Sequence, residues 1–379
     1  MLPSLHTLNL SLREFPEEQQ HIIFNILFGE KLKTLRVVAS VNFPIKLLAY
    51  VPFLSPNVDN LTISGQTHDT WDVEKLSRIF TPAFNLRQCD MKMPDLANKA
   101  LEVLRWLALF PNISTLGLSL GESFSLALST KDYEAWGPAF QSVKELLIQA
   151  DYTTFISPLL RLFSSAPLTS FDIQISAIIP DTDLSGLILT LTRLFDRNLL
   201  KRFHLSAIGV YEIGPLLSLS NLEDVSLDPT PPEMDNTRLR DMISSWPRLR
   251  RLKLCCEEWE QSNLTLQALI LLADAYPGLL YVNMDLNAAE VPANPPQQSR
   301  RPARFRSLDE IFLQFSVMEH PRDVAAFLHE LVPEHTAVRA WMSDRSNPAA
   351  GEMMAALASL RSAQREGSAD SHLNTEAVD

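Results

Sequence analysis

Two short patterns in the sequence place reactive groups at spacings that could support chemistry. Residues 117–121 read Gly-Leu-Ser-Leu-Gly and match the G-x-S-x-G pattern that presents a nucleophilic serine. Such a serine needs a strand, a sharp turn and an immediate helix, with an acid and a histidine later in the chain. Leu118 instead falls on an apolar position of an alternating segment, which predicts a strand that continues through Ser119. We therefore interpret the pattern as structural, and an esterase built on Ser119 remains the enzyme alternative.

The segment from His329 to His335 has the residue types of a zinc-binding helix. In such a helix the two histidines stand four residues apart and share one face. Here the second histidine follows the first by six residues, and Pro333 interrupts the helix between them. Glycine is scarce, at 11 residues, and forms no phosphate-binding loop. We expect a non-catalytic protein without a metal ion or cofactor.

Cysteine usage and composition narrow the class of protein. The three cysteines, Cys89, Cys255 and Cys256, are odd in number and include an adjacent pair, which does not favour a disulfide framework. Four glycosylation sequons begin at Asn9, Asn60, Asn112 and Asn263. They permit a secreted or receptor-type ectodomain, but the N-terminus lacks the basic and apolar regions of a signal peptide. We expect a cytoplasmic or nuclear protein whose sequons occur by chance.

The charge and hydrophobicity exclude two further classes of partner. The chain carries 45 acidic and 33 basic side chains, for a net charge of -12, and such a surface repels phosphates. No apolar run approaches the ~20 residues that cross a bilayer. With 46% hydrophobic residues, the chain is nevertheless able to bury a large core. We expect neither nucleic acid nor a membrane as a partner.

The dominant order in the sequence is a short apolar pattern that recurs from one end to the other. The segment from Leu249 to Leu254 has apolar residues at its first, fourth and sixth positions, and its second half alternates as a half-buried strand does. Eleven more copies open at Leu5, Leu32, Val58, Leu86, Ile113, Val143, Leu168, Leu200, Leu222, Leu279 and Leu308. Successive copies begin 22 to 32 residues apart. Repetition at this period predicts a leucine-rich-repeat solenoid.

Segments of helical period lie between the strands. In residues 97–107, for example, Leu101, Leu104 and Leu107 fall near one face. Further helices are expected at residues 17–28, 73–80, 155–163, 184–195, 236–246, 266–276 and 323–331. We therefore predict an α/β horseshoe of about 12 irregular repeats, with a parallel concave sheet and outer helices. The solenoid and its closing helix would occupy residues 1–335, and residues 336–379 would be a mostly disordered tail with a weak helix.

The candidate binding residues lie on the concave side of the predicted sheet. In each repeat, the variable positions beside the second and third apolar residues point away from the core. From the eighth repeat onward these positions become charged and aromatic, and Arg and Tyr are enriched at protein-binding hot spots. The residues that we expect to contact a partner are Arg202, His204, Arg251, Lys253 and Tyr281. A solvated face without a partner is the alternative.

Several repeats place an aromatic residue and a proline just before the next strand, as in Phe110-Pro111-Asn112-Ile113 and Trp246-Pro247-Arg248-Leu249. Because of these pairs and its irregular repeats, the chain resembles the leucine-rich region of fungal F-box proteins. The resemblance covers residues 1–335. The resemblance implies recruitment of a target protein by the repeats. In that family an N-terminal F-box binds a Skp1-type adaptor of a ubiquitin ligase.

Two features depart from the family pattern. The asparagine that many leucine-rich repeats carry after the strand is replaced by Arg13 and Gln66 in the first and third repeats. Residues 15–27 only faintly resemble an F-box opening and are interpreted as the first solenoid helix. A Skp1-type adaptor is therefore expected only if an F-box is encoded upstream. An intracellular leucine-rich scaffold or regulator unrelated to ubiquitin is the alternative.

Two segments near the ends of the repeat array could involve a cap or a partner: the start of the first repeat and the loop at residues 291–306. The first repeat begins at Leu5 with no segment before it that could cover the sheet edge, so we interpret the chain as the later part of a longer design or as a naturally shortened one, because solenoid ends normally need a cap. Residues 291–302 form a proline-rich, basic loop that Arg304 and Arg306 extend. We interpret residues 291–306 as a solvated loop, with a partner or regulatory site as the alternative.

Overall fold

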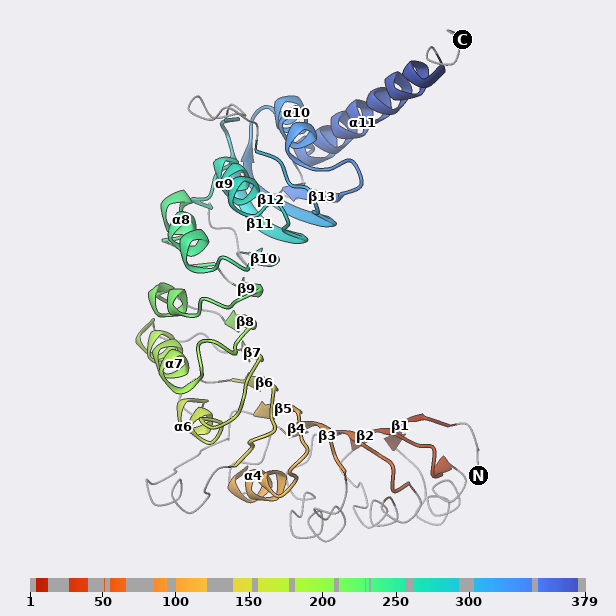
Figure 1. The fold of residues 1–379 in the computed structure, drawn as a ribbon, viewed down its shortest axis with the longest axis vertical. Coiled ribbons are helices and arrows are strands. Elements are labelled where there is room, and N and C mark those ends of the chain that lie inside the picture. The colour runs from red at the N-terminus through yellow and green to blue at the C-terminus, as the bar shows by residue number, and fades with distance from the viewer. Residues whose placement is uncertain are drawn as a thin grey trace. The chain divides into compact units, whose positions relative to one another are not determined.

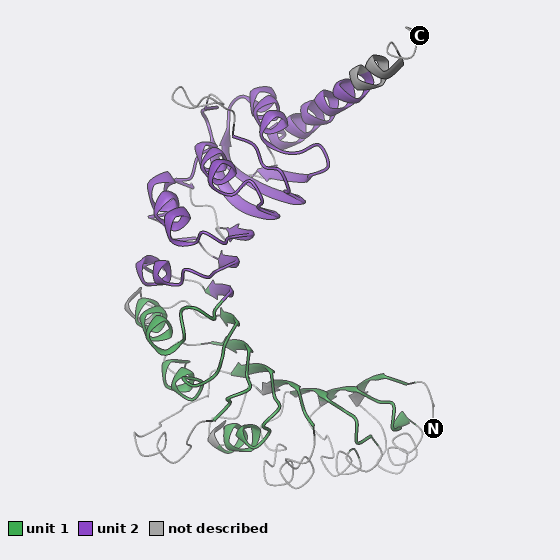
Figure 2. Ribbon diagram, in the orientation of Figure 1, with its two compact units in different colours: residues 1–200, 207–211 green, residues 201–206, 212–379 purple. Residues whose placement is uncertain are grey.

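In the computed structural model, strands recur along the chain, and a helix follows many of them before the next strand begins (Figure 1). The described residues are 5–12, 27–39, 51, 55–65, 85–93, 100–120, 139–151, 156–176, 181–207, 211–228, 230–231, 233–255, 262–292, 303–342 and 347–373. Contacts between Cα atoms divide the chain into two compact units (Figure 2). Unit 1 comprises residues 1–200 and 207–211, and unit 2 comprises residues 201–206 and 212–379.

Unit 1 contains seven described strands, each paired in parallel with the next along the chain. They are β1 (Thr7–Leu12), β2 (Thr34–Ala39), β3 (Asn60–Gly65), β4 (Gln88–Met93), β5 (Thr115–Leu120), β6 (Glu145–Ala150) and β7 (Ser170–Ile175). Its described helices are α4 (Ala100–Ala108), α6 (Ile156–Arg161) and α7 (Asp181–Leu194). The expected helix at residues 73–80 and almost all of the one at 17–28 lie outside the described residues, as do residues 15–26 of the F-box-like segment.

Unit 2 repeats the same arrangement. Its strands are β8 (Arg202–Ala207, whose last residue is grouped with unit 1), β9 (Asp224–Asp228), β10 (Arg251–Leu254), β11 (Tyr281–Ala288), β12 (Glu310–Met318) and β13 (Ala337–Met342). The 3-10 helix η3 (Gly214–Ser218) and the helices α8 (Asn236–Ser245), α9 (Gln267–Ala275), α10 (Pro321–Leu331) and α11 (Ala349–Leu373) complete it. All strand pairs from β8 to β13 are parallel.

The strand register follows the apolar pattern of the sequence. Each of the twelve expected strands begins at the residue predicted to be the first outward-facing position. In unit 2, for example, Arg251 stands beside Asp224 on one side and Tyr281 on the other. The α/β leucine-rich-repeat fold is thus confirmed within each unit, with parallel strands followed by helices.

Inward-facing leucines and the aromatic residues at helix ends form the core. Leu252 and Leu254 of β10 are fully buried, as the alternation predicts. Trp246, just after α8, is also fully buried, and its indole Nε1 donates to the carbonyl of Leu216 at 3.2 Å. Tyr276 occupies the same position after α9, and its hydroxyl contacts the carbonyls of Ile243 and Trp246 at 2.8 and 2.9 Å. Each aromatic therefore links one repeat to the repeat before it.

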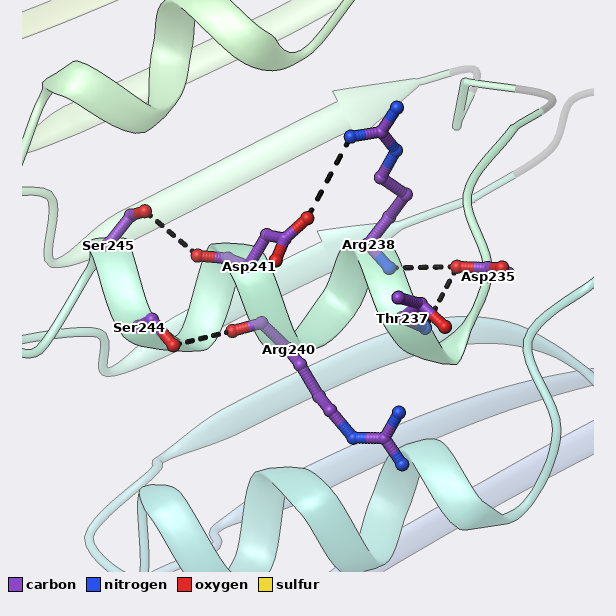
Figure 3. Close-up of polar contacts among 7 residues, drawn as sticks. All are labelled: Asp235, Thr237, Arg238, Arg240, Asp241, Ser244 and Ser245. Carbon is purple, nitrogen blue, oxygen red and sulfur yellow. Dashed lines mark hydrogen bonds and ion pairs between the residues drawn. The ribbon is translucent and has the colours of Figure 1, made fainter.

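In helix α8 a side chain stabilises the N-terminal end (Figure 3). Asp235 accepts hydrogen bonds from the backbone amides of Thr237 and Arg238, both at 2.8 Å, and so caps the first turn. The exposed face carries Arg238, paired with Asp241 at 3.8 Å, and Arg240. Because both arginines lie on the helix side of the repeat, they differ in location from the arginines of the sheet.

The C-terminal region differs from the sequence expectation. Residues 336–379 were expected to be a mostly disordered tail, but they contain β13 and the 25-residue helix α11. Met353 and Leu357 of α11 are buried, and Arg361 donates to the carbonyls of Thr336 and Pro333. Helix α11 packs against α10 and β13. The repeat array therefore continues past residue 335, with a thirteenth strand.

Within the described residues, none of the helices combines the length and apolarity needed to span a bilayer.

Candidate functional site

The candidate site is the open face of unit 2, defined as the side chains at the first, third and fifth positions counted from the start of each strand from β8 to β13; in β10 the fifth position, Cys255, directly follows the last strand residue, Leu254. Across the strands these positions form three rows of residues in register. The first row is Arg202, Asp224, Arg251, Tyr281, Glu310 and Ala337. The second is His204, Ser226, Lys253, Asn283, Phe312 and Arg339. The third is Ser206, Asp228, Cys255, Asp285, Gln314 and Trp341.

Three of the five predicted residues belong to one connected group. His204 Nε2 lies 3.3 Å from Asp224 Oδ1, and Arg251 Nε lies 3.7 Å from Asp224 Oδ2. The Arg251 guanidinium carbon in turn lies 4.6 Å from the centre of the Tyr281 ring, within the range of a cation–π interaction. Arg202 is exposed and stands beside Asp224 in the strand register. The strand register therefore brings these residues together on one face.

Lys253 is held differently from the arginines. Its ammonium nitrogen lies 2.6 Å from Asp228 Oδ2, and both side chains are largely withdrawn from solvent. Burial alone would lower the pKa of Lys253, but the hydrogen bond and charge of Asp228, helped by Cys255 and Tyr281, outweigh it and raise the pKa. Lys253 is therefore charged and directed toward its own carboxylate, which makes it a less available contact than Arg251.

An aromatic row extends from Tyr281 across the next two strands. The Tyr281 and Phe312 ring centres lie 5.8 Å apart, and those of Phe312 and Trp341 lie 6.2 Å apart. The Arg339 guanidinium carbon stands 5.0 Å from the centre of the Phe312 ring, and its Nη2 atom lies 3.4 Å from Glu310 Oε1. The indole of Trp341 donates to Gln314 Oε1 at 2.6 Å. Three neighbouring rings thus form a row over β11 to β13, and guanidinium groups from β10 and β13 stack on the first two of them.

Sequence reasoning missed part of this row. Phe312 was on the outward-facing side of the predicted twelfth strand but was not selected as a binding residue. Arg339 and Trp341 were missed because residue 335, where the repeat pattern expects an apolar side chain, is His335. The apolar residues Val338, Ala340 and Met342 fall on every second position of this segment, and that alternation was the signal that could have identified a strand.

The open face of unit 1 has a different chemistry. Its side chains bond mainly to neighbours in the same row, as in Asn60 with Gln88 at 2.9 Å. Ser119 lies inside β5, as expected, and its hydroxyl contacts Gln149 Oε1 at 3.4 Å. The described part of β5 therefore has no turn that would expose Ser119 as an elbow nucleophile.

The histidine pattern also lacks the geometry of a metal site. His329 lies in α10, whereas His335 lies beyond the end of that helix. In the part of the chain that the structure describes, no three His, Cys, Asp or Glu side chains are grouped so that they could hold a metal ion. The basic residues 300 and 301 of the 291–306 loop lie outside the described residues, whereas Arg304 and Arg306 are exposed.

Comparisons with known proteins give a structural likeness only. No family model matches the sequence, and no curated protein matches it. Among solved structures, a chain of the crystal structure of the Rad7 and Elc1 complex in yeast is similar, with 16% sequence identity and a TM-score of 0.46. The match covers 76% of this chain and 72% of that chain.

Proposed function

We propose that the protein is a non-catalytic interaction module whose protein partner docks on the open face of unit 2. The observation that carries the proposal is the ordered group of Arg251, Tyr281, Phe312, Arg339 and Trp341, in which rings and guanidinium groups hold one another in place. Rigid aromatic and arginine side chains are the types that contribute most to protein interfaces. Trp341 is the single aromatic among the exposed large apolar side chains in the described ranges.

The ion pairs and ring contacts on this face contribute little to the stability of the fold. Exposed pairs such as Arg339 with Glu310, whose side chains are 65% and 33% exposed, contribute roughly 0–1 kcal/mol. An aromatic pair adds about 0.5–1.5 kcal/mol beyond its buried area. An inward-facing leucine contributes more, at about 1.5–3 kcal/mol. The composition of the face is therefore better suited to recognition than to holding the repeats together.

Quantitative affinity purification of the full chain tests this proposal. The wild type is compared with a double variant, Arg251→Glu with Tyr281→Ala, and with Arg240→Glu on the exposed side of α8. We expect the double variant to lose its specific partners by about tenfold or more, because each truncated hot spot costs about 1–2 kcal/mol. Arg240→Glu is the matched control, since it makes the same charge reversal on the helix side and should keep the partners.

Two results would contradict the proposal. The partners could remain on the double variant while its thermal unfolding matches that of the wild type. Alternatively, Arg240→Glu could remove the same partners to the same extent. Either outcome would place the interaction away from the open face of unit 2.

We further propose that the chain is the target-recognition part of an F-box ubiquitin-ligase receptor that works in the cytoplasm or nucleus. The style of the repeats, with aromatic-proline pairs such as Trp246-Pro247, supports this kinship. The test is co-purification of the product of the complete transcript with a Skp1-type adaptor. Recovery of the adaptor is expected, and a stable product that never binds it would favour a leucine-rich scaffold unrelated to ubiquitin.

A further inference from the structure

The aromatic row on the open face of unit 2 has a regular spacing that limits what can lie along it. Tyr281, Phe312 and Trp341 occupy the first, third and fifth positions of successive strands, so the row crosses the sheet diagonally. Its ring centres are 5.8 and 6.2 Å apart. Alternate side chains of an extended peptide are about 6.6 Å apart, whereas the three-residue turn of polyproline II rises about 9.3 Å. The spacing therefore matches an extended segment that contacts the row with every second residue.

Two positions along the row present guanidinium groups to solvent. Arg251 stacks on Tyr281 and is 50% exposed, and Arg339 stacks on Phe312 and is 65% exposed. Their acidic neighbours are more withdrawn, at 22% for Asp224 and 33% for Glu310. Arg251 Nε lies 3.7 Å from Asp224 and Arg339 Nη2 lies 3.4 Å from Glu310, distances longer than a tight charge-assisted hydrogen bond. The cations are thus the outermost charges here and can turn donors toward an incoming anion.

The charges around the row favour carboxylates over other anions. Each guanidinium is already paired with one carboxylate, Asp224 or Glu310, so the local net charge is close to zero and offers a phosphate dianion little extra attraction over a singly charged carboxylate. The net charge of -12 also opposes a polyanion such as a nucleic acid or a long acidic run. At the end of the row, Trp341 offers an exposed ring, and among the described residues the stacked guanidinium groups lie on Tyr281 and Phe312 instead. That position suits an apolar side chain.

We propose that the open face of unit 2 binds an extended peptide segment with carboxylates at two alternate positions and an apolar side chain at the next alternate position. The carboxylates would pair with Arg251 and Arg339, and the apolar group would pack on Trp341. The segment can run in either direction along the row. This inference rests on the proposed function and specifies the chemistry of the partner.

The test uses fluorescence anisotropy of a labelled nonapeptide, Gly-Ser-Glu-Thr-Glu-Thr-Phe-Ser-Gly, with the full chain. Four comparison peptides replace both Glu by Gln, replace both Glu by phosphoserine, move the second Glu next to the first, or replace Phe by Ser. We expect saturable binding of the first peptide, with the Gln and adjacent-Glu peptides about tenfold weaker, because each loses charge-assisted contacts. Tighter binding of the phosphoserine peptide would overturn the choice of carboxylate.

Variants of the protein assign the contacts. Arg251→Gln and Arg339→Gln should each weaken the peptide by about tenfold, and Trp341→Ala should weaken it and abolish the preference for Phe over Ser in the peptide. Arg240→Gln on α8 is the matched control and should bind as the wild type does. Equal weakening by Arg240→Gln, or no effect of Arg251→Gln and Arg339→Gln, would overturn the proposal, as would absence of saturable binding up to about 1 mM peptide.

The two proposals fail in different ways. If the peptide does not bind but the Arg251→Glu and Tyr281→Ala double variant loses its purified partners, the face is a docking site with another chemistry. If the peptide binds through Arg251 and Arg339 but no purified partner depends on the face, the peptide chemistry stands and the proposed function fails.

Discussion

At the scale of single residues, adjacent repeat positions serve opposite purposes on the two sides of the sheet, because the first strand residue faces outward and the second faces the core. Arg251 and Tyr281 on the open face are arranged by the register, whereas Cys89 on the inner face of β4 is fully buried. Burial raises the pKa of the Cys89 thiol far above its ordinary value of 9.0, and the nearby charge of Asp90 acts in the same direction. The thiol is therefore a core group that remains protonated in the folded protein.

The raised pKa of Cys89 predicts a loss of stability in alkali. Above pH 9 the unfolded chain releases the thiol proton while the folded chain keeps it, so unfolding becomes easier by up to about 1.4 kcal/mol per pH unit. The Cys89→Ala variant lacks this effect. We expect the stability difference between wild type and variant, measured by urea unfolding, to shrink steadily from pH 8.5 to about pH 10.5. The half-buried Cys255 supplies the control variant, Cys255→Ala. A constant difference across this range would show that the thiol ionises equally in both states.

At the scale of elements, apolar periodicity determined which strands could be found. The sequence predicted the first residue of each strand from β1, which begins at Thr7, to β12, which begins at Glu310. Two signals allowed this: an apolar residue two positions before the strand, and alternating apolar residues within it. Strand β13 lacks the first signal, since His335 occupies that position, and its inward side chains, Val338 and Ala340, are only half-buried. The packing of α11 on β13, a tertiary contact, completes that repeat and is not visible in a local pattern.

The same limit applies to the candidate site. The charged and aromatic character of the open face follows from counting outward positions, so Arg251 and Tyr281 could be selected from the sequence. Their stacking, and the recessed position of Asp224, depend on rotamers that neighbouring strands determine. Arg339 and Trp341 could not be selected once their strand was missed.

The aromatic residues at helix ends predict a measurable contribution to the stability of one repeat on the next. The Tyr276→Phe substitution keeps the ring but removes the hydroxyl that contacts two carbonyls, those of Ile243 and Trp246. We expect a loss of about 1–2 kcal/mol in the free energy of unfolding, measured by urea denaturation, because the buried carbonyl of Trp246 loses this donor. Tyr281→Phe makes the same chemical change on the open face and should cost less than about 0.5 kcal/mol. Equal effects of the two substitutions would indicate that the hydroxyl of Tyr276 is not a link between repeats.

At the scale of the whole molecule, a chain of parallel repeats is stabilised by contacts between neighbours. In each unit the strands pair in sequence order, so a defect is expected to weaken its own repeat and the adjacent ones most strongly. A fully cooperative domain would instead spread the loss over every strand. The two possibilities differ in how hydrogen-exchange protection changes along the chain.

Leu252→Ala provides the decisive case, because this side chain is fully buried at the centre of β10. The cavity should cost about 2–5 kcal/mol of local stability. Hydrogen exchange followed by mass spectrometry should show faster exchange in β9, β10 and β11, which pair directly, and unchanged protection in β1 to β6 of unit 1. Leu116→Ala in β5, where the side chain is also fully buried, is the reciprocal control and should leave β10 to β13 unchanged. A uniform loss of protection from β1 to β13 in both variants would mean that the repeats unfold as one cooperative body, because local pairing would then no longer limit how far a core defect is felt.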